Sequence, residues 1–315
     1  MLLILLALIS LALPTFAQTQ PFRPSAKDGK VRGVNIGGWL VLEPYIRPSL
    51  FEQFKPNKWS IPTAVDEWTF CEQLGAEEAA RQLHSHYENW FIENDARLLA
   101  EAGISHIRLG IGYWAIIPNS SEPYITGQLP YLKKALIWAK KYGLKVMIDL
   151  HAAPGSQNGW NHSGHQGVVR WNTPENWNAT LVVLRKLIEE TYLQPGYAEV
   201  VNWLGVVNEP FLPVTIDELK FFYKAAYDMI RNDLNISSLA LTFSDSFRSG
   251  AFKGYFGDTK MQNVAFEPHV YHLFDPGSLQ QSLDRRIVQV CSGDKGNMAS
   301  LELRFNDDFD AFAQK

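Results

Sequence analysis

The sequence contains few cysteines and no clustered positive charge. Among 315 residues there are two cysteines, Cys71 and Cys291, which are too few for a disulfide scaffold. They lie far apart in the chain, and nothing in the sequence shows that they pair. Neither belongs to a Cys-x-x-Cys motif, so no redox or metal site is indicated. Runs rich in lysine or arginine are also lacking, and the formal net charge is −4, which argues against nucleic acid as a partner.

The chain opens with an almost wholly apolar stretch, MLLILLALISLALPTFA (1–17), with Pro14 near its end and small Ala17 before polar residues. This pattern is typical of a secretory signal peptide. A membrane anchor is the alternative, but spanning takes about 20 apolar residues and Pro14 shortens the usable run to roughly a dozen. We therefore predict a cleaved signal and a protein secreted to the medium or the cell wall, without membrane association after cleavage. Four sequons fit export and are glycosylation candidates: Asn119, Asn161, Asn178 and Asn235.

Short apolar runs alternate with longer amphipathic stretches along most of the remaining chain. Six strands are expected, at 31–38, 106–111, 144–151, 203–209, 239–245 and 264–272. Helices are expected at about 76–102, 130–142, 174–191, 215–233 and 276–290, each bounded by turn-forming residues such as glycine or proline. Near-continuous apolar strands that alternate with helices indicate a parallel sheet covered by helices.

Two α/β architectures fit this alternation, an open doubly wound sheet and a (β/α)8 TIM barrel. The open form often carries a glycine-rich phosphate loop after its first strand. Gly33, Gly37 and Gly38 lack the Gly-x-Gly-x-x-Gly spacing and lead into Trp39 rather than into a helix. Polar residues end several expected strands instead, which is where a barrel assembles its active site: Arg108, His151, Asn208, Glu209, Asp245, His269 and Tyr271. The barrel is therefore predicted.

Glu209 is the strongest candidate for chemistry, because it ends the apolar run WLGVVNEPF (203–211). A carboxyl group at the mouth of a barrel is partly desolvated, so we predict a raised pKa suited to donating a proton. Asn208 beside it could hydrogen-bond a substrate hydroxyl, and Pro210 stops the strand. The alternative is a helix-capping or surface-paired glutamate, which is the commoner role for a strand-end acid.

Other polar residues of the strands have structural as well as functional interpretations. Arg108 lies inside an otherwise apolar strand and needs an acidic partner, in a pair that is purely structural or that keeps a catalytic carboxylate ionised. We interpret His151 as a structural hydrogen-bond donor rather than a base, and Asp149 as structural. His269 and Tyr271 share strand parity, so both are expected to face the cleft.

Five segments together resemble glycoside hydrolase family 5, most closely its secreted fungal exo-β-1,3-glucanases. They are RGVNIGGWLVLEPYIRPSLFE (32–52), HIRLGIGYWAI (106–116), DLHAAPGSQNGWNHSG (149–164), GVVNEP (205–210) and HVYHLF (269–274). All five match the family in order and spacing. An endo-acting β-1,4-glucanase of the same family is an alternative, and the first segment favours the exo-β-1,3 group.

The resemblance implies a (β/α)8 barrel that releases glucose from the non-reducing end of β-1,3-glucan with retention of configuration. Glu209 would be its general acid/base. Substrate-binding roles are implied for Glu43, Arg108, His151, Trp160, Asn161, Asn208, His269 and Tyr271. The family usually has an acid where this chain has Asn161. No cofactor or metal is implied, because two carboxylates and water suffice for this chemistry, and we expect a monomer whose partner is β-1,3-glucan or its oligosaccharides.

The family's second carboxylate has no match in this sequence. Retaining glycosidases need two carboxylates about 5–5.5 Å apart, and the family's nucleophile lies on the seventh strand within Gly-Glu-Trp, a tripeptide that is absent here. The resemblance ends near Cys291, whose disulfide partner in the family would lie further downstream, and the family's last-strand tryptophan is also unmatched. We therefore expect a signal at 1–17, a barrel at 18–291 truncated after about six β/α units, and a divergent tail at 292–315. Glu267 and Glu302 are the possible substitutes for the nucleophile.

Three interpretations of the whole chain remain. It is a shortened product of an exo-β-1,3-glucanase gene, a non-catalytic secreted β-glucan-binding protein, or an inactive truncated product. Glucose release from laminarin separates the first from the second, because hydrolysis needs a nucleophile and binding does not. A cooperative melting transition separates the second from the third. We expect no measurable turnover from a chain that ends at Lys315.

Overall fold

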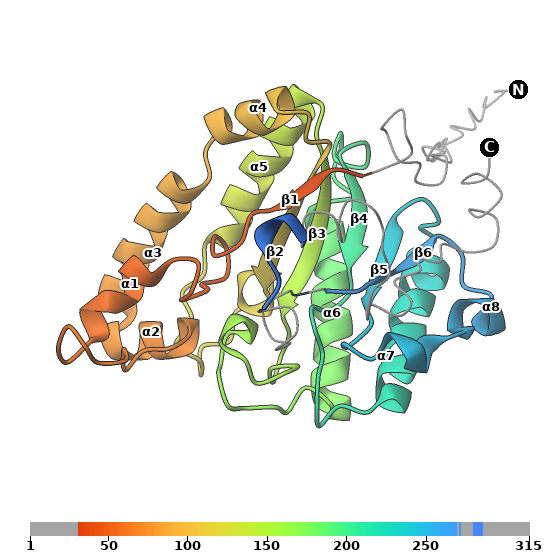
Figure 1. Cartoon of the computed structure of the whole chain (residues 1–315). Coiled ribbons are helices and arrows are strands. Elements are labelled where there is room, and N and C mark those ends of the chain that lie inside the picture. The colour runs from red at the N-terminus through yellow and green to blue at the C-terminus, as the bar shows by residue number, and fades with distance from the viewer. Residues whose placement is uncertain (1–30, 270, 272–279, 286–315) are drawn as a thin grey trace, which may run out of the picture.

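The computed structural model describes residues 31–269, 271 and 280–285. Six parallel strands form one sheet in the order of the sequence (Figure 1). They are β1 (Gly33–Asn35), β2 (His106–Gly112), β3 (Lys145–Ala152), β4 (Val201–Gly205), β5 (Ala240–Ser244) and β6 (Val264–Glu267). All six predicted strands are confirmed, although most are shorter than their apolar runs.

Helices connect consecutive strands and lie outside the curled sheet (Figure 1). They are α1 (Pro48–Phe51), α2 (Glu67–Leu74), α3 (Ala76–Trp90), α4 (Glu93–Glu101), α5 (Gln128–Tyr142), α6 (Pro174–Glu190), α7 (Ile216–Asp228) and α8 (Tyr255–Thr259). Parallel neighbours joined by helical crossovers are the arrangement of a (β/α)8 barrel, so the predicted fold class is confirmed for these six units. None of the helices in this part of the chain is long and apolar enough to cross a membrane.

Several predictions fall outside the described residues. They concern the signal peptide at 1–17, most of the helix expected at 276–290, Cys291, the tail at 292–315 and Glu302. Cys71 is described, and it is a buried free thiol.

The predicted single helix at 76–102 is wrong, because the chain breaks between α3 and α4. Phe91 adopts an extended conformation there and is buried. Its ring lies 5.3 Å from that of Trp39 and 6.0 Å from that of Trp138, between centroids. The next helix then starts afresh, with the Asp95 carboxylate accepting a hydrogen bond from the Ile92 amide at 3.0 Å. Burial of one aromatic side chain thus overrides a continuous helical pattern.

The two faces of the central strands differ in polarity. Ile107 and Leu109 of β2 pack with Ile148 of β3 in the hydrophobic core and are fully buried. The opposite face carries Arg108 and Asp149, which lie on neighbouring strands. Alternation along each strand therefore separates an apolar face from a polar one.

Glycine on both neighbouring strands makes room for the polar side chains of β3. Asp149 lies opposite Gly110 of β2 and Gly205 of β4 in the strand register. A Cβ atom at Gly205 would lie 2.7 Å from Asp149 Oδ1, and one at Gly110 would lie 3.1 Å from the ring of His151. A larger side chain at either position would displace the acid or the histidine.

A buried acid, Glu67 at the start of α2, fixes the loop that follows β1. Its Oε2 accepts a hydrogen bond from the Leu42 amide at 2.8 Å, and its Oε1 accepts one from Trp114 Nε1 at 3.0 Å. Burial raises the pKa of Glu67 from 4.5 to about 8, and these two hydrogen bonds oppose the rise only in part. The carboxyl group is therefore neutral at pH 7 in the folded protein.

This buried acid predicts a pH-dependent stability. Between pH 4.5 and 8 the unfolded chain releases the Glu67 proton while the native state keeps it, so stability should fall as pH rises. The expected slope is at most about 1.4 kcal/mol per pH unit for one proton. Urea unfolding at pH 5, 6, 7 and 8 would measure it. Glu67→Gln should flatten the slope, whereas Glu77→Gln, at an exposed position of α3, should not.

Candidate active site

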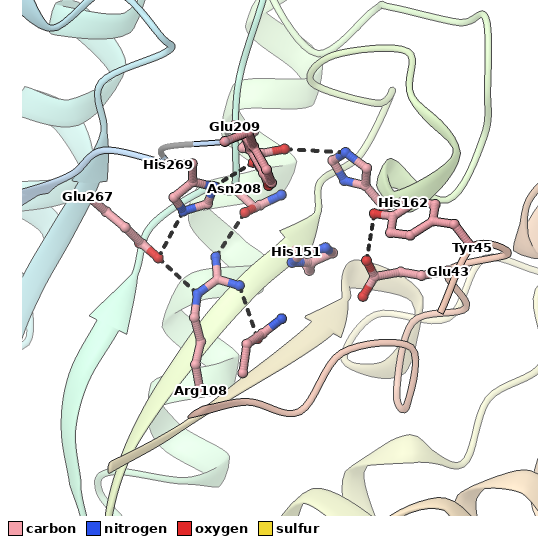
Figure 2. A pocket seen from close by; sticks show the side chains of 11 residues that line it. Glu43, Tyr45, Arg108, His151, His162, Asn208, Glu209, Glu267 and His269 are labelled. Carbon is pink, nitrogen blue, oxygen red and sulfur yellow. Dashed lines mark hydrogen bonds and ion pairs between the residues drawn. The ribbon is translucent and has the colours of Figure 1, made fainter. Parts of the chain in front are cut away.

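A pocket of about 290 Å³ opens at the carboxyl ends of the strands (Figure 2). Seven of the predicted site residues line it: Glu43, Arg108, His151, Asn208, Glu209, His269 and Tyr271. Its other lining residues are Asn35, Tyr45, His162 and Glu267. Residues from almost every described strand or its following loop thus meet at one place, as the barrel prediction requires. The pocket is polar, and its volume lies near the lower end of the range for small-molecule sites.

Arg108 is the centre of a charged network at the pocket floor. Its Nη2 lies 3.0 Å from Asp149 Oδ2 and donates to Asn208 Oδ1 at 2.8 Å, while its Nε lies 2.8 Å from Glu267 Oε1. Burial disfavours the guanidinium charge, but the surrounding carboxylates more than compensate and raise its pKa. The predicted acidic partner of Arg108 is therefore Asp149, with Glu267 as a second.

His151 is oriented by the same aspartate. Its Nδ1 lies 2.7 Å from Asp149 Oδ2. Its Nε2 has no hydrogen-bond partner among the described residues. The second ring nitrogen is thus left for a ligand, which adds a possible contact to the structural role predicted for His151.

An unusual backbone turn presents Glu209 to the pocket. Glu209 has a φ of 45°, in the left-handed region that non-glycine residues rarely adopt. Amides of the loop after β3 hold this turn: Gln157 Nε2 donates to the Asn208 carbonyl at 2.8 Å, and Asn158 Nδ2 donates to the Glu209 carbonyl at 3.0 Å. Strained backbone of this kind persists only where its surroundings fix it, and it clusters at functional sites.

Three side chains contact the Glu209 carboxylate, and Figure 2 shows the contacts of His269 and His162. His269 Nδ1 lies 2.5 Å from Oε1, and the Tyr271 hydroxyl donates to the same oxygen at 3.0 Å. His162 Nε2 lies 3.3 Å from Oε2. The predicted convergence of His269 and Tyr271 on the cleft is therefore confirmed, and both act directly on Glu209.

The raised pKa predicted for Glu209 is wrong in this structure. Burial does raise it, as expected, but the hydrogen bonds and charge of His269, together with His162 and Tyr271, lower the pKa to about 2. The two histidines themselves differ in charge. Burial and His151 lower the pKa of His162 to about 4, whereas Glu209 and Glu267 outweigh burial and raise the pKa of His269 to about 9.

Glu43 forms the opposite wall of the pocket. Its Oε1 accepts the Gly38 amide at 2.8 Å, and its Oε2 accepts the hydroxyl of Tyr45 at 2.7 Å. Tyr45 itself is 62% exposed and stands at the pocket rim. Glu43 is therefore fixed at the pocket wall, and the substrate contact that the resemblance implies for it stays a prediction.

Trp160 and Asn161 are not among the pocket-lining residues. The ring centroid of Trp160 lies 5.4 Å from that of Phe211 and 5.8 Å from that of Phe247, so Trp160 belongs to an aromatic group. Asn161 begins a 3₁₀ turn and is half-buried. A direct substrate contact by either residue remains a prediction. Asp245, the other strand-end candidate, accepts a hydrogen bond from the Phe247 amide at 2.9 Å within a turn.

The sequence reasoning missed Asn35, Tyr45 and His162 as pocket residues. A usable signal existed for His162, because it lies in the amide-rich loop after the strand that ends at His151. Tyr45 lies two residues after Glu43 in one of the resembling segments. The described residues include no group of three histidine, cysteine, aspartate or glutamate side chains arranged to hold a metal ion.

Known proteins similar to this chain include a family model and curated relatives. The family model "Cellulase (glycosyl hydrolase family 5)" matches residues 71–315. The chain is 41% identical over 269 residues to "Probable glucan 1,3-beta-glucosidase A" of Aspergillus niger, covering 84% of this chain and 61% of that protein. It is 42% identical over 265 residues to "Glucan 1,3-beta-glucosidase 1" of Schizosaccharomyces pombe, covering 84% and 64%. The chain thus spans less than two thirds of the length of these relatives.

Solved structures agree with the fold. The chain matches "Crystal structure of AoRut" with a TM-score of 0.68 at 25% identity, covering 78% of this chain and 70% of that one. It matches the "Crystal structure of rutinosidase from Aspergillus niger" with a TM-score of 0.67 at 25% identity, covering 78% and 71%.

Proposed function

The chain belongs to glycosyl hydrolase family 5, and from this membership we propose that it acts on β-1,3-glucan as a retaining exo-β-1,3-glucanase. The observation that carries the proposal is Glu209, a buried carboxylate on a strained turn after β4, oriented into a polar pocket by His269 and Tyr271. The names of the curated relatives support glucan as the substrate.

The pocket residues divide into proton transfer and sugar binding. Glu209 would protonate the leaving oxygen and later deprotonate water. Asn208 Nδ2 has no hydrogen-bond partner among the described residues and could donate to a sugar hydroxyl. Glu43, on the opposite side of the pocket, could accept hydrogen bonds from sugar hydroxyls, because a carboxylate oxygen is a strong acceptor for O–H donors.

Besides Glu209, two carboxylates line the pocket, Glu43 and Glu267, and neither fits the role of nucleophile. Glu43 accepts hydrogen bonds at both oxygens, and so does Glu267, which also pairs with Arg108. A carboxylate held by donors at both oxygens is a weak attacking group. Hydrolysis would therefore use a carboxylate outside the described residues. The same observation favours a second function, β-glucan binding without hydrolysis.

Glucose release from laminarin decides between the two. From a protein that carries the missing carboxylate we expect glucose release with retained anomeric configuration, detected by NMR before mutarotation, and a preference for laminarin over cellulose and over rutin. From a chain that ends at Lys315 we expect no turnover. Binding of laminari-oligosaccharides without glucose release from pure, cooperatively melting protein would instead establish the binding function. Neither binding nor hydrolysis would contradict both.

We further propose that the protein is secreted, monomeric and glycosylated. The support for glycosylation is that Asn119, Asn178 and Asn235 are exposed, whereas Asn161 is half-buried beside the pocket loop. The intact mass of protein recovered from the medium, before and after deglycosylation, would test secretion and glycosylation, and size-exclusion chromatography would test the monomeric state.

A further inference from the structure

Glu267 lies at the end of β6 and contacts three polar side chains. Its Oε1 lies 2.8 Å from Arg108 Nε and 3.1 Å from His269 Nε2. Its Oε2 accepts the hydroxyl of Thr242 at 3.0 Å. Burial would raise its pKa, but Arg108 and His269 outweigh burial and lower the pKa to about 2. Glu267 is therefore an ionised group held in one position.

His269 lies between two carboxylates, as Figure 2 shows. Its Nδ1 is 2.5 Å from Glu209 Oε1, and its Nε2 is 3.1 Å from Glu267 Oε1. A neutral imidazole carries one proton and can donate to only one of these partners. When the ring is an imidazolium, both nitrogens carry a proton and each can donate to its carboxylate. The raised pKa of His269 agrees with this geometry.

This arrangement raises a question about the general acid. Glu209 must carry a proton when it meets the leaving oxygen, yet its pKa of about 2 leaves it ionised at neutral pH. The donors at Glu209 Oε1 are His269 Nδ1 and the Tyr271 hydroxyl. Burial and Glu209 raise the pKa of Tyr271. The imidazolium is therefore the more acidic of the two donors and the better source of the proton.

We propose that Glu267 is a positioning residue for the acid step. By accepting the Nε2–H of His269 it keeps the Nδ1–H directed at Glu209, so that His269 stores the proton which Glu209 delivers to the leaving oxygen. The inference rests on the proposed role of Glu209 as acid/base. It assigns to Glu267 a function other than that of the missing nucleophile.

The proton balance of the step is simple. The proton moves from His269 Nδ1 to Glu209 Oε1, which leaves a neutral imidazole that still donates Nε2–H to Glu267. Glu209 then gives this proton to the glycosidic oxygen as the C–O bond breaks; the oxygen keeps the bonding electron pair, and the nucleophilic carboxylate, which would lie outside the described residues, bonds to the anomeric carbon. In the second half Glu209 takes a proton from water as the water oxygen bonds to the anomeric carbon and displaces that carboxylate, and the proton returns to His269. No oxidant or reductant takes part.

Charged and titratable groups from several segments surround the Glu209–His269–Glu267 set. Arg108 on β2 opposes protonation of His269, and its own charge is balanced by Asp149 on β3. The other titratable groups that line the pocket are Glu43 and Tyr45 from the loop after β1, His151 at the end of β3, His162 from the loop after β3, and Tyr271 after β6. The pKa of His269 depends on Glu209, Glu267 and Arg108 together, so the test needs a variant that changes Glu267 alone.

Nitrogen-15 NMR of the histidine rings tests the proposal without any substrate. In the unaltered chain we expect the His269 signal, assigned by its loss in His269→Asn, to report an imidazolium with a pKa of about 9. Glu267→Gln should lower that pKa by at least one unit, a tenfold loss of proton affinity. Glu267→Asp keeps the charge at a longer distance and should give a smaller shift. Glu190→Gln removes a surface partner of Lys133 and should give none.

Two results would overturn the proposal. One is a His269 pKa near the ordinary value of about 6.5 in the unaltered chain. The other is an unchanged His269 pKa in a Glu267→Gln protein that still melts cooperatively. If Glu267→Gln does not fold, Glu267→Asp carries the test, and an unshifted His269 pKa in that variant counts equally against the role of Glu267.

Kinetics separate acid positioning from a merely structural effect. Where glucosides are hydrolysed, Glu267→Gln should lower kcat at least tenfold more for an alkyl leaving group than for 2,4-dinitrophenolate, which departs without protonation. KM should change little. Equal losses for both substrates would assign Glu267 a structural role only. Because the titration needs no substrate, failed hydrolysis counts against the proposed function and leaves the NMR result standing.

Discussion

Glu209→Gln is expected to slow glucose release from laminarin by about 10²- to 10⁴-fold, the usual contribution of a general acid/base. Glutamine preserves the shape of the side chain and can still accept the hydroxyl of Tyr271. Its amide, however, cannot receive the proton from His269 and pass it to the leaving oxygen. The loss should appear in kcat and be measured as initial rates in a preparation whose unaltered form releases glucose.

Binding and added azide provide the controls for this variant. Laminari-oligosaccharide affinity should stay within a few-fold, because Asn208 and Glu43 are unchanged. Glu101→Gln, at an exposed position paired with Arg97, should leave the rate unaltered. Azide needs no general base, so it should restore turnover of an activated aryl glucoside in Glu209→Gln. A loss below tenfold, or no azide effect, would remove Glu209 from the acid/base role.

The strand pattern was readable from the sequence because strands buried on both faces leave long apolar runs. The strand ends were predicted less accurately than the strands themselves. The run at 31–38 predicts eight strand residues, but β1 covers only Gly33–Asn35, and the chain then turns, with Gly38 at a φ of 63°. The break at Phe91 depends on contacts with Trp39 and Trp138 from distant segments. No local pattern contains that information.

The helix α2 was missed although a local signal was present. Asp66 caps it by accepting the Thr69 amide at 2.7 Å, while the Thr69 hydroxyl accepts the Asp66 amide at 3.2 Å. Asp-x-x-Thr resembles the capping box, in which the third residue is more often Glu or Gln. The helix Glu67–Leu74 is only 8 residues long, so its apolar residues show little periodicity and the helix was easy to overlook.

For the site, residue identity was easier to predict than electrostatics. A strand-end position identified Glu209, because parallel strands direct their carboxyl ends to one mouth, and Arg108 was identified as a charge inside an otherwise apolar strand. The pKa of Glu209 was predicted in the wrong direction, since burial alone was considered. The direction of this pKa shift depends on the imidazolium of His269, which contacts Glu209 through Nδ1 and Glu267 through Nε2. Such a three-body arrangement exists only once β4 and β6 are placed in the same sheet.

Arg108→Met should reduce the free energy of unfolding by about 3–5 kcal/mol at pH 7, as expected when one partner of a buried ion pair is removed. Methionine has similar length but no charge, so Asp149 and Glu267 lose the cation between them. Urea unfolding measures the loss. Arg185→Met is the matched control, because its partner Asp233 lies 2.8 Å away at the surface. An exposed pair of this kind contributes about 0–1 kcal/mol.

The pH dependence of Arg108→Met distinguishes lost charge compensation from lost packing. In the unaltered protein Glu267 has a lowered pKa of about 2, so its contribution persists at neutral pH and disappears only as pH falls toward that value. Without Arg108 the buried carboxylate of Glu267 should have a raised pKa, and the pH dependence of its contribution to stability reverses. Stability is then greater at low pH and falls as pH rises through that pKa. Both proteins share the Glu67 contribution, so acidification from pH 7 to 5 should narrow the difference in free energy of unfolding between the variant and the parent. A loss of stability that does not depend on pH would mean that Arg108 acts through packing of its aliphatic stem. A loss no larger than that of Arg185→Met would mean that the charged network at the pocket floor is not a source of stability.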